Sequence, residues 1–272
     1  MTHRRPLSLW ALVVCALVTT ACAKAPAAPT DAELRRRGEA LIAKMSDRLA
    51  AAQRLSFTTT EELARTRDDA RRTQKLSRQI VVLRPDRLYF KVSGDRDMEA
   101  FYDGRRFTLV SHRDKVFGDF AAPSSLDDTV DILGARYDIP LPIGDLLTVN
   151  ARQALMSSQT TGGWVAEESI DGILTARFEW RHPNVDWSIW IPVAGEPLPK
   201  KMLILYKTRR GHPQVTITFA NWNLDVQVRE GIFIARVPPD YEGIAVIQRA
   251  DSVLPSDSDA TPTATSGRTA RR

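Results

Sequence analysis

The chain has 272 residues, of which 43% are hydrophobic and 26% are charged, with 14 Gly and 16 Pro. These fractions exclude a disordered or collagen-like protein, and the length is enough for one large domain or two small ones. The formal net charge of +5 arises from 38 Lys and Arg against 33 Asp and Glu, and the basic residues are scattered among acidic ones. We therefore predict no nucleic-acid partner, because such proteins carry a basic face or stripe.

The first 21 residues have the layout of a secretory signal peptide. Arg4 and Arg5 precede an uncharged, mostly apolar run that ends before Lys24, which matches a basic region followed by a hydrophobic region. The run is marginal in length for a membrane-spanning helix, which needs about 20 apolar residues. We therefore predict that residues 1–21 direct export and are then removed.

Two routes of cleavage are consistent with the residues that follow. Val18 to Cys22 reads VTTAC and resembles a bacterial lipobox, in which a small residue precedes an acylated Cys, although Thr19 stands where Leu is usual. Ordinary cleavage after Ala23 or Ala25 is the alternative. We favour lipidation of Cys22, which would anchor the protein to a membrane. By analogy with the lipoprotein sorting rule, Ala23 in place of an Asp favours the outer membrane, and both routes place the chain on the periplasmic side.

The remainder divides into a tether, one domain and a tail. Residues 22–30 hold the proposed lipidated Cys and an Ala/Pro-rich linker, which we expect to be extended. Residues 251–272 are rich in Ser, Thr, Asp and Pro, a composition that predicts disorder. The predicted domain is residues 31–250.

The first predicted element of the domain is a long amphipathic helix over residues 31–54. Thr30 and Glu33 have the spacing of a capping box, which marks a helix start. Leu34, Leu41 and Met45 follow at helical spacing among charged residues, so the helix must bury one apolar stripe against another element.

Beyond this helix the hydrophobic period changes to two, which is typical of strands. Asp103-Gly104 and Asp171-Gly172 each separate two such runs and predict tight hairpins. A helical interlude divides the strands: one helix capped by Ser124 and ended by Pro140, then a second over residues 144–156. The predicted strands are residues 55–60, 74–83, 88–92, 98–102, 107–110, 116–120, 164–169, 173–180, 186–192, 201–208 and 214–220, with a short piece at 232–235.

This order of elements predicts an α+β fold with a large antiparallel sheet of about 10–11 strands. Each strand has one apolar phase, whereas the opposite phase carries Thr, Lys, Arg, Glu and Ser. One face of the sheet should therefore be covered and the other should face water. Because such a large sheet tends to curl, we expect the helices to cover its concave face.

The sequence contains no recognisable catalytic or cofactor motif. It has 4 His and 2 Cys, and none of the histidines beyond the signal peptide has the spacing of a metal site with a second His or Cys. A nucleophile elbow, a phosphate-binding loop and a dinucleotide fingerprint are all missing. We therefore predict a protein that is not an enzyme, with no metal and no cofactor.

Seven short motifs occur in a fixed order along the domain: LRPDRL (83–88), FYDG (101–104), YDIPLP (137–142), GDLL (144–147), VDWSIWI (185–191), PLPK (197–200) and NWN (221–223). Together they resemble a family of predicted bacterial periplasmic proteins related to the lipoprotein carrier and receptor (LolA/LolB-like) fold. The resemblance covers about residues 35–240. It implies an unclosed, strongly curved antiparallel half-barrel with helices lining its mouth, where relatives hold acyl chains or bind protein partners.

These observations predict an exported cell-envelope lipoprotein that binds a lipid or a lipoprotein acyl chain in the concave face of the half-barrel. The alternative is a periplasmic interaction, sensor or assembly module with a filled core and no ligand. In that case Trp190, on the opposite phase from Trp187, is either exposed to contact an envelope protein or covered by the C-terminal segment. The candidate ligand-binding residues are Phe57, Leu88, Phe90, Val92, Phe107, Leu109, Phe178, Trp180, Trp187, Ile189, Ile204, Tyr206, Ile217 and Phe219.

Overall fold

The computed structural model describes residues 29–67, 70–137, 139, 141–156 and 158–248. The predicted signal peptide, Cys22, most of the linker and the predicted disordered tail (residues 251–272) lie outside these residues. The predicted domain of residues 31–250 is therefore described almost completely.

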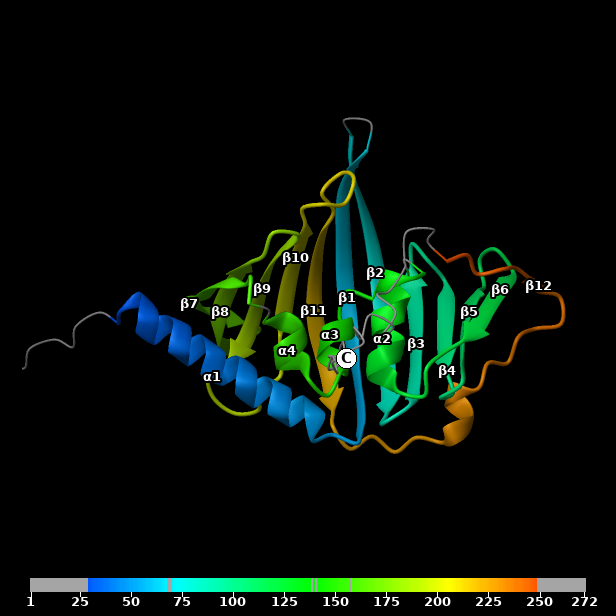
Figure 1. The fold of residues 1–272 in the computed structure, drawn as a ribbon, viewed down its shortest axis with the longest axis horizontal. Coiled ribbons are helices and arrows are strands. Elements are labelled where there is room, and N and C mark those ends of the chain that lie inside the picture. Colours follow the sequence, from blue (N-terminus) through cyan, green and yellow to red (C-terminus); the bar gives the residue numbers. More distant parts are fainter. Residues whose placement is uncertain (1–28, 68–69, 138, 140, 157, 249–272) are drawn as a thin grey trace, which may run out of the picture.

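One large, open sheet dominates the described part of the chain (Figure 1). Its order is β12-β6-β5-β4-β3-β2-β1-β11-β10-β9-β8-β7, so β7 and β12 are unpaired edges and the sheet does not close. All neighbours pair antiparallel except β12 and β6, which are parallel. The strands are β1 Arg54–Arg67, β2 Ala70–Leu83, β3 Arg87–Gly94, β4 Met98–Tyr102, β5 Arg106–Ser111, β6 Val116–Ala121, β7 Thr161–Ile170, β8 Ile173–Arg181, β9 Val185–Pro192, β10 Lys201–Tyr206, β11 Gln214–Asn223 and β12 Glu242–Gly243.

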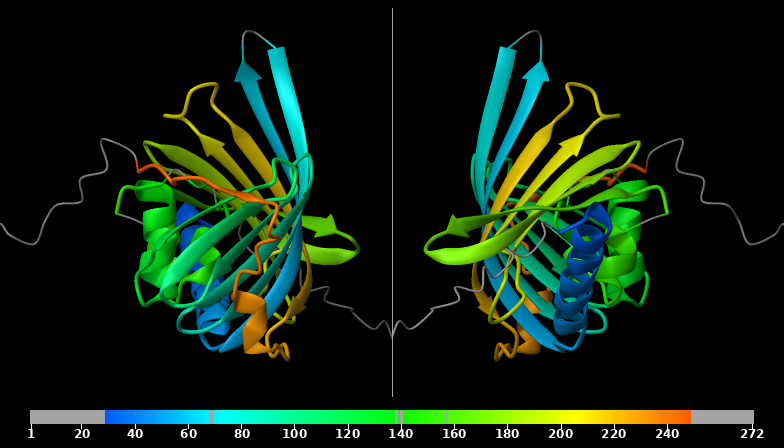
Figure 2. Two further views of the ribbon diagram at one scale, coloured as in Figure 1. Left: turned by 90° about the vertical axis from the view of Figure 1, so that its right-hand side faces the viewer. Right: turned by 90° about the vertical axis from the view of Figure 1, so that its left-hand side faces the viewer.

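The predicted α+β fold and unclosed sheet are confirmed, and both Asp-Gly hairpins form. Gly104 and Gly172 have φ of 87° and 77°, values that glycine adopts without steric cost. The described residues hold twelve strands, and the additional one is the two-residue β12. The β1–β2 hairpin is longer than predicted and rises beyond its neighbours (Figure 2).

Helix α1 Asp31–Ala50 lies along the concave side of the sheet. The capping box at its start is present, because the side chain of Thr30 accepts from the Glu33 amide. The helix ends four residues before the predicted end, since the chain must turn to enter β1 at Arg54. It packs closely on the β7–β8 end: a Cβ built on Gly38 would lie 3.0 Å from the Phe178 ring.

The helical interlude forms three short helices, α2 Leu126–Ala135, α3 Gly144–Leu147 and α4 Ala151–Leu155. The predicted single helix over residues 144–156 is wrong, because Thr148 adopts an extended conformation with φ −75° and ψ 156°. The cap of α2 is Ser125 rather than the predicted Ser124, and its hydroxyl oxygen accepts from the Asp128 amide at 3.1 Å.

The outer face of the sheet is not uniformly polar. The prediction that one face is covered and the whole of the other faces water is therefore corrected. Residues 224–243, which we call the C-terminal strap, cross the outer face of β2–β6 and include the 3₁₀ helix η1 Glu230–Phe233. The short strand predicted at 232–235 is therefore wrong. The strap is needed because the outward phase carries its own apolar cluster: Val81, Tyr89, Phe101 and Val110, with Phe233 fully buried against them.

A polar network fastens the end of this strap. The ring nitrogens of His112 lie 2.9 Å from the hydroxyl of Tyr241 and 2.9 Å from a carboxylate oxygen of Glu99. Tyr89 donates to the other Glu99 oxygen at 2.6 Å. Burial alone would raise the pKa of Glu99, but the hydrogen bonds from Tyr89 and His112 lower it below its ordinary value. The ionised carboxylate thus stabilises this network.

Candidate functional site

The predicted ligand-binding residues all point to the concave side, but they divide into two groups. All fourteen belong to one core cluster or pack against it. Eight of them are packed into the core and line neither of the two cavities described below: Phe57, Leu88, Phe107, Phe178, Trp180, Ile189, Ile217 and Phe219. The other six line those cavities: Phe90, Val92, Leu109, Trp187, Ile204 and Tyr206.

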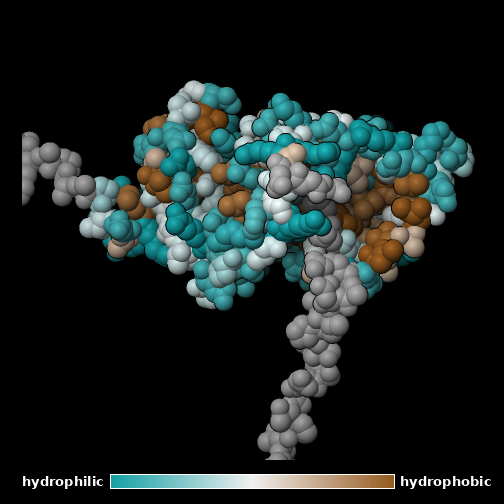
Figure 3. All heavy atoms as spheres, turned by 90° about the horizontal axis from the view of Figure 1, so that it is seen from above, coloured by the Kyte–Doolittle hydropathy of each residue, from teal (hydrophilic) through white to brown (hydrophobic). Residues whose placement is uncertain are grey.

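The first cavity, which we call the mouth cavity, lies between the upper half of the sheet and the loop that carries Ile139 and Pro142. Its volume is about 380 Å³. Apolar side chains from six strands, β1–β5 and β11, form its floor, among them Leu63, Leu76 and Val215. Seen from above, this end of the molecule has polar surface with apolar side chains recessed between (Figure 3).

Charged side chains also line the mouth cavity, and most of them are arginines. Arg65, Arg78, Arg96 and Arg209 line it together with Glu61, so the formal charge of its described lining residues is +3. The Arg209 guanidinium lies 4.7 Å from the centre of the Tyr206 ring. The Thr66 amide donates to the Gly211 carbonyl at 3.3 Å, which holds the β1–β2 hairpin against the β10–β11 turn.

Glu61 and Arg78 form a buried ion pair on the apolar face beside this cavity. The Glu61 carboxylate accepts from Arg78 Nε at 2.9 Å and from Nη2 at 3.1 Å. It also accepts from the Thr59 hydroxyl at 2.8 Å. Only 2% of the Glu61 side chain and 5% of the Arg78 side chain are exposed, and Arg78 lies over the Phe90 ring at 5.0 Å. A buried charge persists in an apolar face only when it is paired in this way.

The second cavity, which we call the inner cavity, lies next to the first and shares Ile139, Pro142 and Tyr206 with it. Its volume is about 370 Å³. Its described lining residues include Asp131 and Asp145 but no arginine or lysine, so the described linings of the two neighbouring cavities differ in the sign of their charge. Desolvation raises the pKa of Asp145, and the nearby carboxylate of Asp131 raises it further.

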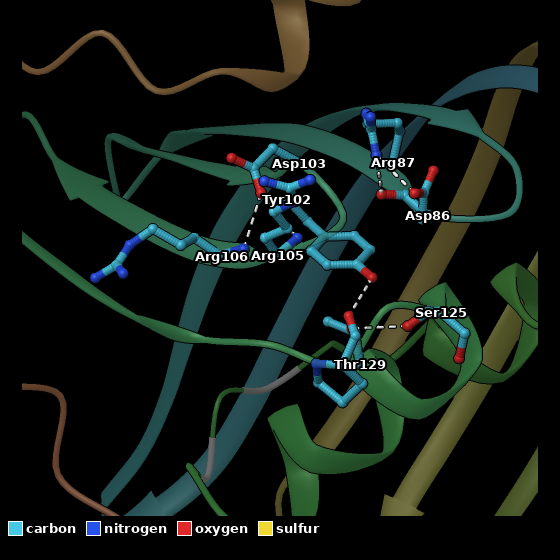
Figure 4. Close-up of polar contacts among 9 residues, drawn as sticks. Asp86, Arg87, Tyr102, Asp103, Arg105, Arg106, Ser125 and Thr129 are labelled. Carbon is cyan, nitrogen blue, oxygen red and sulfur yellow. Dashed lines mark hydrogen bonds and ion pairs between the residues drawn. The ribbon is translucent and has the colours of Figure 1, made fainter.

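The cover over these cavities is fastened at defined points. The Tyr102 hydroxyl, on β4, donates to the Pro123 carbonyl at 2.5 Å and holds the start of α2 against the sheet (Figure 4). Thr129 donates to the Ser125 carbonyl one turn back, at 2.8 Å. At the far side, the Asp127 carboxylate accepts from the Val149 amide at 3.1 Å, which ties α2 to the segment between α3 and α4.

Trp190 does not form an exposed patch, so the prediction that it is exposed for contact with an envelope protein is wrong. Only 5% of the residue is exposed. Its ring nitrogen donates to Glu168 at 2.8 Å, and the Lys201 ammonium lies 4.9 Å from the ring centre. Polar side chains of the neighbouring strands therefore cover this face of the indole.

The sequence contained a signal for the charged residues that the predictions missed. Glu61 and Arg78 occupy the inward, apolar phase of β1 and β2, between Phe57 and Leu63 on one strand and beside Ile80 on the other. A charged residue in an apolar phase indicates either an error in strand register or a polar site. By contrast, Arg96 and Arg209 come from turns, and no periodic pattern marks them.

Within the described ranges, no group of three or more His, Cys, Asp or Glu side chains is placed to hold a metal ion. None of the helices there has the length and apolar composition needed to cross a membrane.

Similarities to solved structures extend over about three quarters of the chain. A search among curated proteins found no match. Among solved structures, an uncharacterized conserved protein from Thermus thermophilus superposes with a TM-score of 0.44 and 8% identity, covering 75% of this chain and 98% of that one. LprF from Mycobacterium bovis superposes with a TM-score of 0.41 and 11% identity, covering 76% of this chain and 98% of that one. A LolA superfamily protein from Nitrosomonas europaea superposes with a TM-score of 0.38 and 11% identity, covering 73% of this chain and 97% of that one.

The family comparison is the most extensive in sequence. The family model described as "Predicted periplasmic protein (DUF2092)" matches residues 38–247, which is most of the chain and nearly all of the described domain. This range also contains all seven motifs on which the resemblance rests. The chain therefore belongs to the DUF2092 family of predicted periplasmic proteins.

Proposed function

We propose that the protein is an exported cell-envelope lipoprotein that binds a lipid or lipoprotein acyl chain, without catalysis, in the concave face of its half-barrel. The mouth cavity is the observation that carries this proposal. Its volume of about 380 Å³ falls in the range of small-molecule sites, and its floor is apolar. A fold that needed only a core would gain dispersion energy by closing such a space.

The N-terminal sequence and the family description together support the proposed location. Membership of a family described as periplasmic supports export, and lipidation of Cys22 would then fix the domain to a membrane, in our proposal the outer one. Residues 22–30 would serve as the tether. The partner we propose is a lipid or an acylated protein, and contact with an envelope protein remains a prediction.

The chemistry of the floor sets how binding should depend on acyl-chain length. Each buried methylene contributes about 0.8 kcal/mol, which is roughly a fourfold change in Kd. Association itself costs at least about 4 kcal/mol. A short chain should therefore bind weakly, and affinity should rise with each added methylene until the cavity is full.

The test combines native mass spectrometry with a matched pair of variants. Gently purified wild-type protein should retain lipid. Leu63→Trp places a bulky indole ring in the mouth cavity that Leu63 lines. It should weaken binding of acyl amphiphiles about tenfold or more, because the ring would displace roughly two methylenes of the acyl chain from the cavity. The control is Glu62→Trp, because Glu62 is the neighbouring exposed residue on the opposite face. Absence of retained lipid, together with no binding of any acyl amphiphile, would contradict the proposal and favour the interaction module.

A further inference from the structure

Among the described residues that line the mouth cavity, arginines outnumber acidic side chains. Four arginines and one glutamate line it, and the glutamate is already engaged by Arg78. The part of the inner cavity's lining that the structure describes has two aspartates and no arginine or lysine. A ligand that reaches both cavities therefore meets arginines in one and carboxylates in the other.

The arginines near the tip of the β1–β2 hairpin increase this charge. Arg65 and Arg72 are direct partners across the antiparallel pair, an arrangement in which like charges destabilise a sheet. In the part of the chain that the structure describes, Arg65, Arg72 and Arg96 form no ion pair. Arg65 and Arg72 are exposed and Arg96 is half-buried, and Arg65 and Arg96 line the mouth cavity.

Directly beneath these cations the surface becomes apolar. Arg65 and Arg96 share the cavity with Leu76, Val92 and Val215. Charged groups at the entrance and hydrocarbon below form a lining that is complementary to an amphiphile rather than to a purely apolar or a purely ionic ligand. Guanidinium groups bind carboxylates and phosphates through paired, charge-assisted hydrogen bonds.

We propose that the mouth cavity selects amphiphiles with an anionic headgroup. Arg65 and Arg96 hold the headgroup, and the acyl chain lies on the apolar floor. This inference rests on the proposed acyl-binding function and adds the headgroup chemistry to it. The shared chemistry is an oxyanion on a single acyl chain, which either a fatty-acid carboxylate or a lysophospholipid phosphate provides.

The experiment uses three probes with the same acyl chain: palmitate, palmitoyl lysophosphatidylglycerol and the neutral 1-monopalmitoylglycerol. Their Kd values are measured by calorimetry below the micelle concentration for the wild-type protein and for the double variant Arg65→Gln/Arg96→Gln. The control is Arg36→Gln/Arg37→Gln, which removes the same charge from the exposed face of α1. Thermal unfolding of all variants checks that the fold is retained.

Both anionic probes, or one of them, should bind the wild-type protein more tightly than the neutral probe. The double variant should weaken anionic binding about tenfold or more, as expected for lost hydrogen bonds to a charged group, and leave the neutral probe within about twofold. The control should behave as wild type. Preference for palmitate or for the lysophospholipid identifies the carboxylate or the phosphate as the source of the anion.

Two results would overturn the inference in distinguishable ways. Equal binding of neutral and anionic probes, unchanged in the double variant, removes the headgroup selection and leaves acyl binding intact. Failure of all three probes to bind removes the proposed function itself. A comparison of the three probes on the wild-type protein alone already decides between these results, so the test does not depend on the stability of a variant.

Discussion

Removal of Glu61 should reveal how strongly the buried ion pair constrains the concave face. Glu61→Leu deletes the carboxylate that accepts two bonds from Arg78 and one from Thr59. The Arg78 guanidinium then remains only 5% exposed without its counter-ion. The loss of one partner of a buried pair costs about 3–5 kcal/mol, a large share of the roughly 5–15 kcal/mol by which domains are stable.

The double variant Glu61→Leu/Arg78→Met should behave differently, since it replaces both charges by apolar side chains. Exchange of a whole buried pair for hydrophobic residues is often neutral or stabilising by about 1–4 kcal/mol. The double variant should therefore be at least as stable as wild type, although one of its component changes is strongly destabilising. Urea unfolding of wild type, both single variants and the double variant gives the coupling energy of the pair.

The reasoning fails if the four proteins show simple additivity. A Glu61→Leu variant that loses less than about 1 kcal/mol would mean that water reaches the guanidinium through the mouth cavity and solvates it. A double variant as unstable as the sum of its parts would mean that the two side chains contribute through packing rather than through their charges. In either case the pair could not be considered a buried electrostatic constraint.

Three further predictions concern the cover, the strap and the anchor. Gly134→Ala should stabilise the protein by about 0.5–1 kcal/mol in urea unfolding through helix propensity, because its Cβ meets nothing within 4 Å. Gly38→Ala gains the same propensity, but its Cβ meets the buried Phe178 ring at 3.0 Å, so it should stabilise the protein less than Gly134→Ala does. The pKa of Glu99 is lowered in the folded protein, so its carboxylate contributes stability that is present above the unfolded pKa of about 4.5 and is lost as the pH falls through the folded pKa. Glu99→Gln should therefore reduce the loss of unfolding free energy between neutral and acidic pH. An unchanged dependence of the unfolding free energy on acidic pH would contradict this. Cys22→Ser should abolish labelling with radioactive palmitate and release the protein from the membrane fraction, and unchanged membrane attachment would refute lipidation.

The inward apolar phase was predictable because it follows from alternation. Phe90 and Val92 on β3, or Trp187 and Ile189 on β9, are two residues apart, and every residue of this phase must leave water on the same side of the sheet. The same alternation predicted that the opposite, polar phase faces water along the whole sheet. It failed at Tyr89, which is buried because a distant strap covers it, and no local pattern reports such a contact.

The cavity residues were harder to predict for a related reason. Six of the fourteen inward residues line a cavity and eight do not, yet both groups are apolar and alternate identically. Whether an inward side chain meets another side chain or open space depends on the position of the cover, which is a tertiary property. The break of the predicted helix over residues 144–156 at Thr148 belongs to the same class, because it depends on where the cover must bend to follow the sheet.

The position of the opening follows from where the chain covers its own sheet. Helix α1 packs on the β7–β8 end, where Gly38 allows close approach. At the other end the C-terminal segment passes over the edge, and Val246 packs against Gly118 of β6. Between them, within the described part of the chain, only the short helices α2–α4 and their loops cover the sheet, and helices of this length are unstable in isolation. Their hydrogen bonds to the rest of the fold, each worth about 0.5–1.5 kcal/mol, therefore hold the cover in place. If the cavity holds an acyl chain as we propose, a chain longer than the cavity should displace this segment before it moves either end of the sheet.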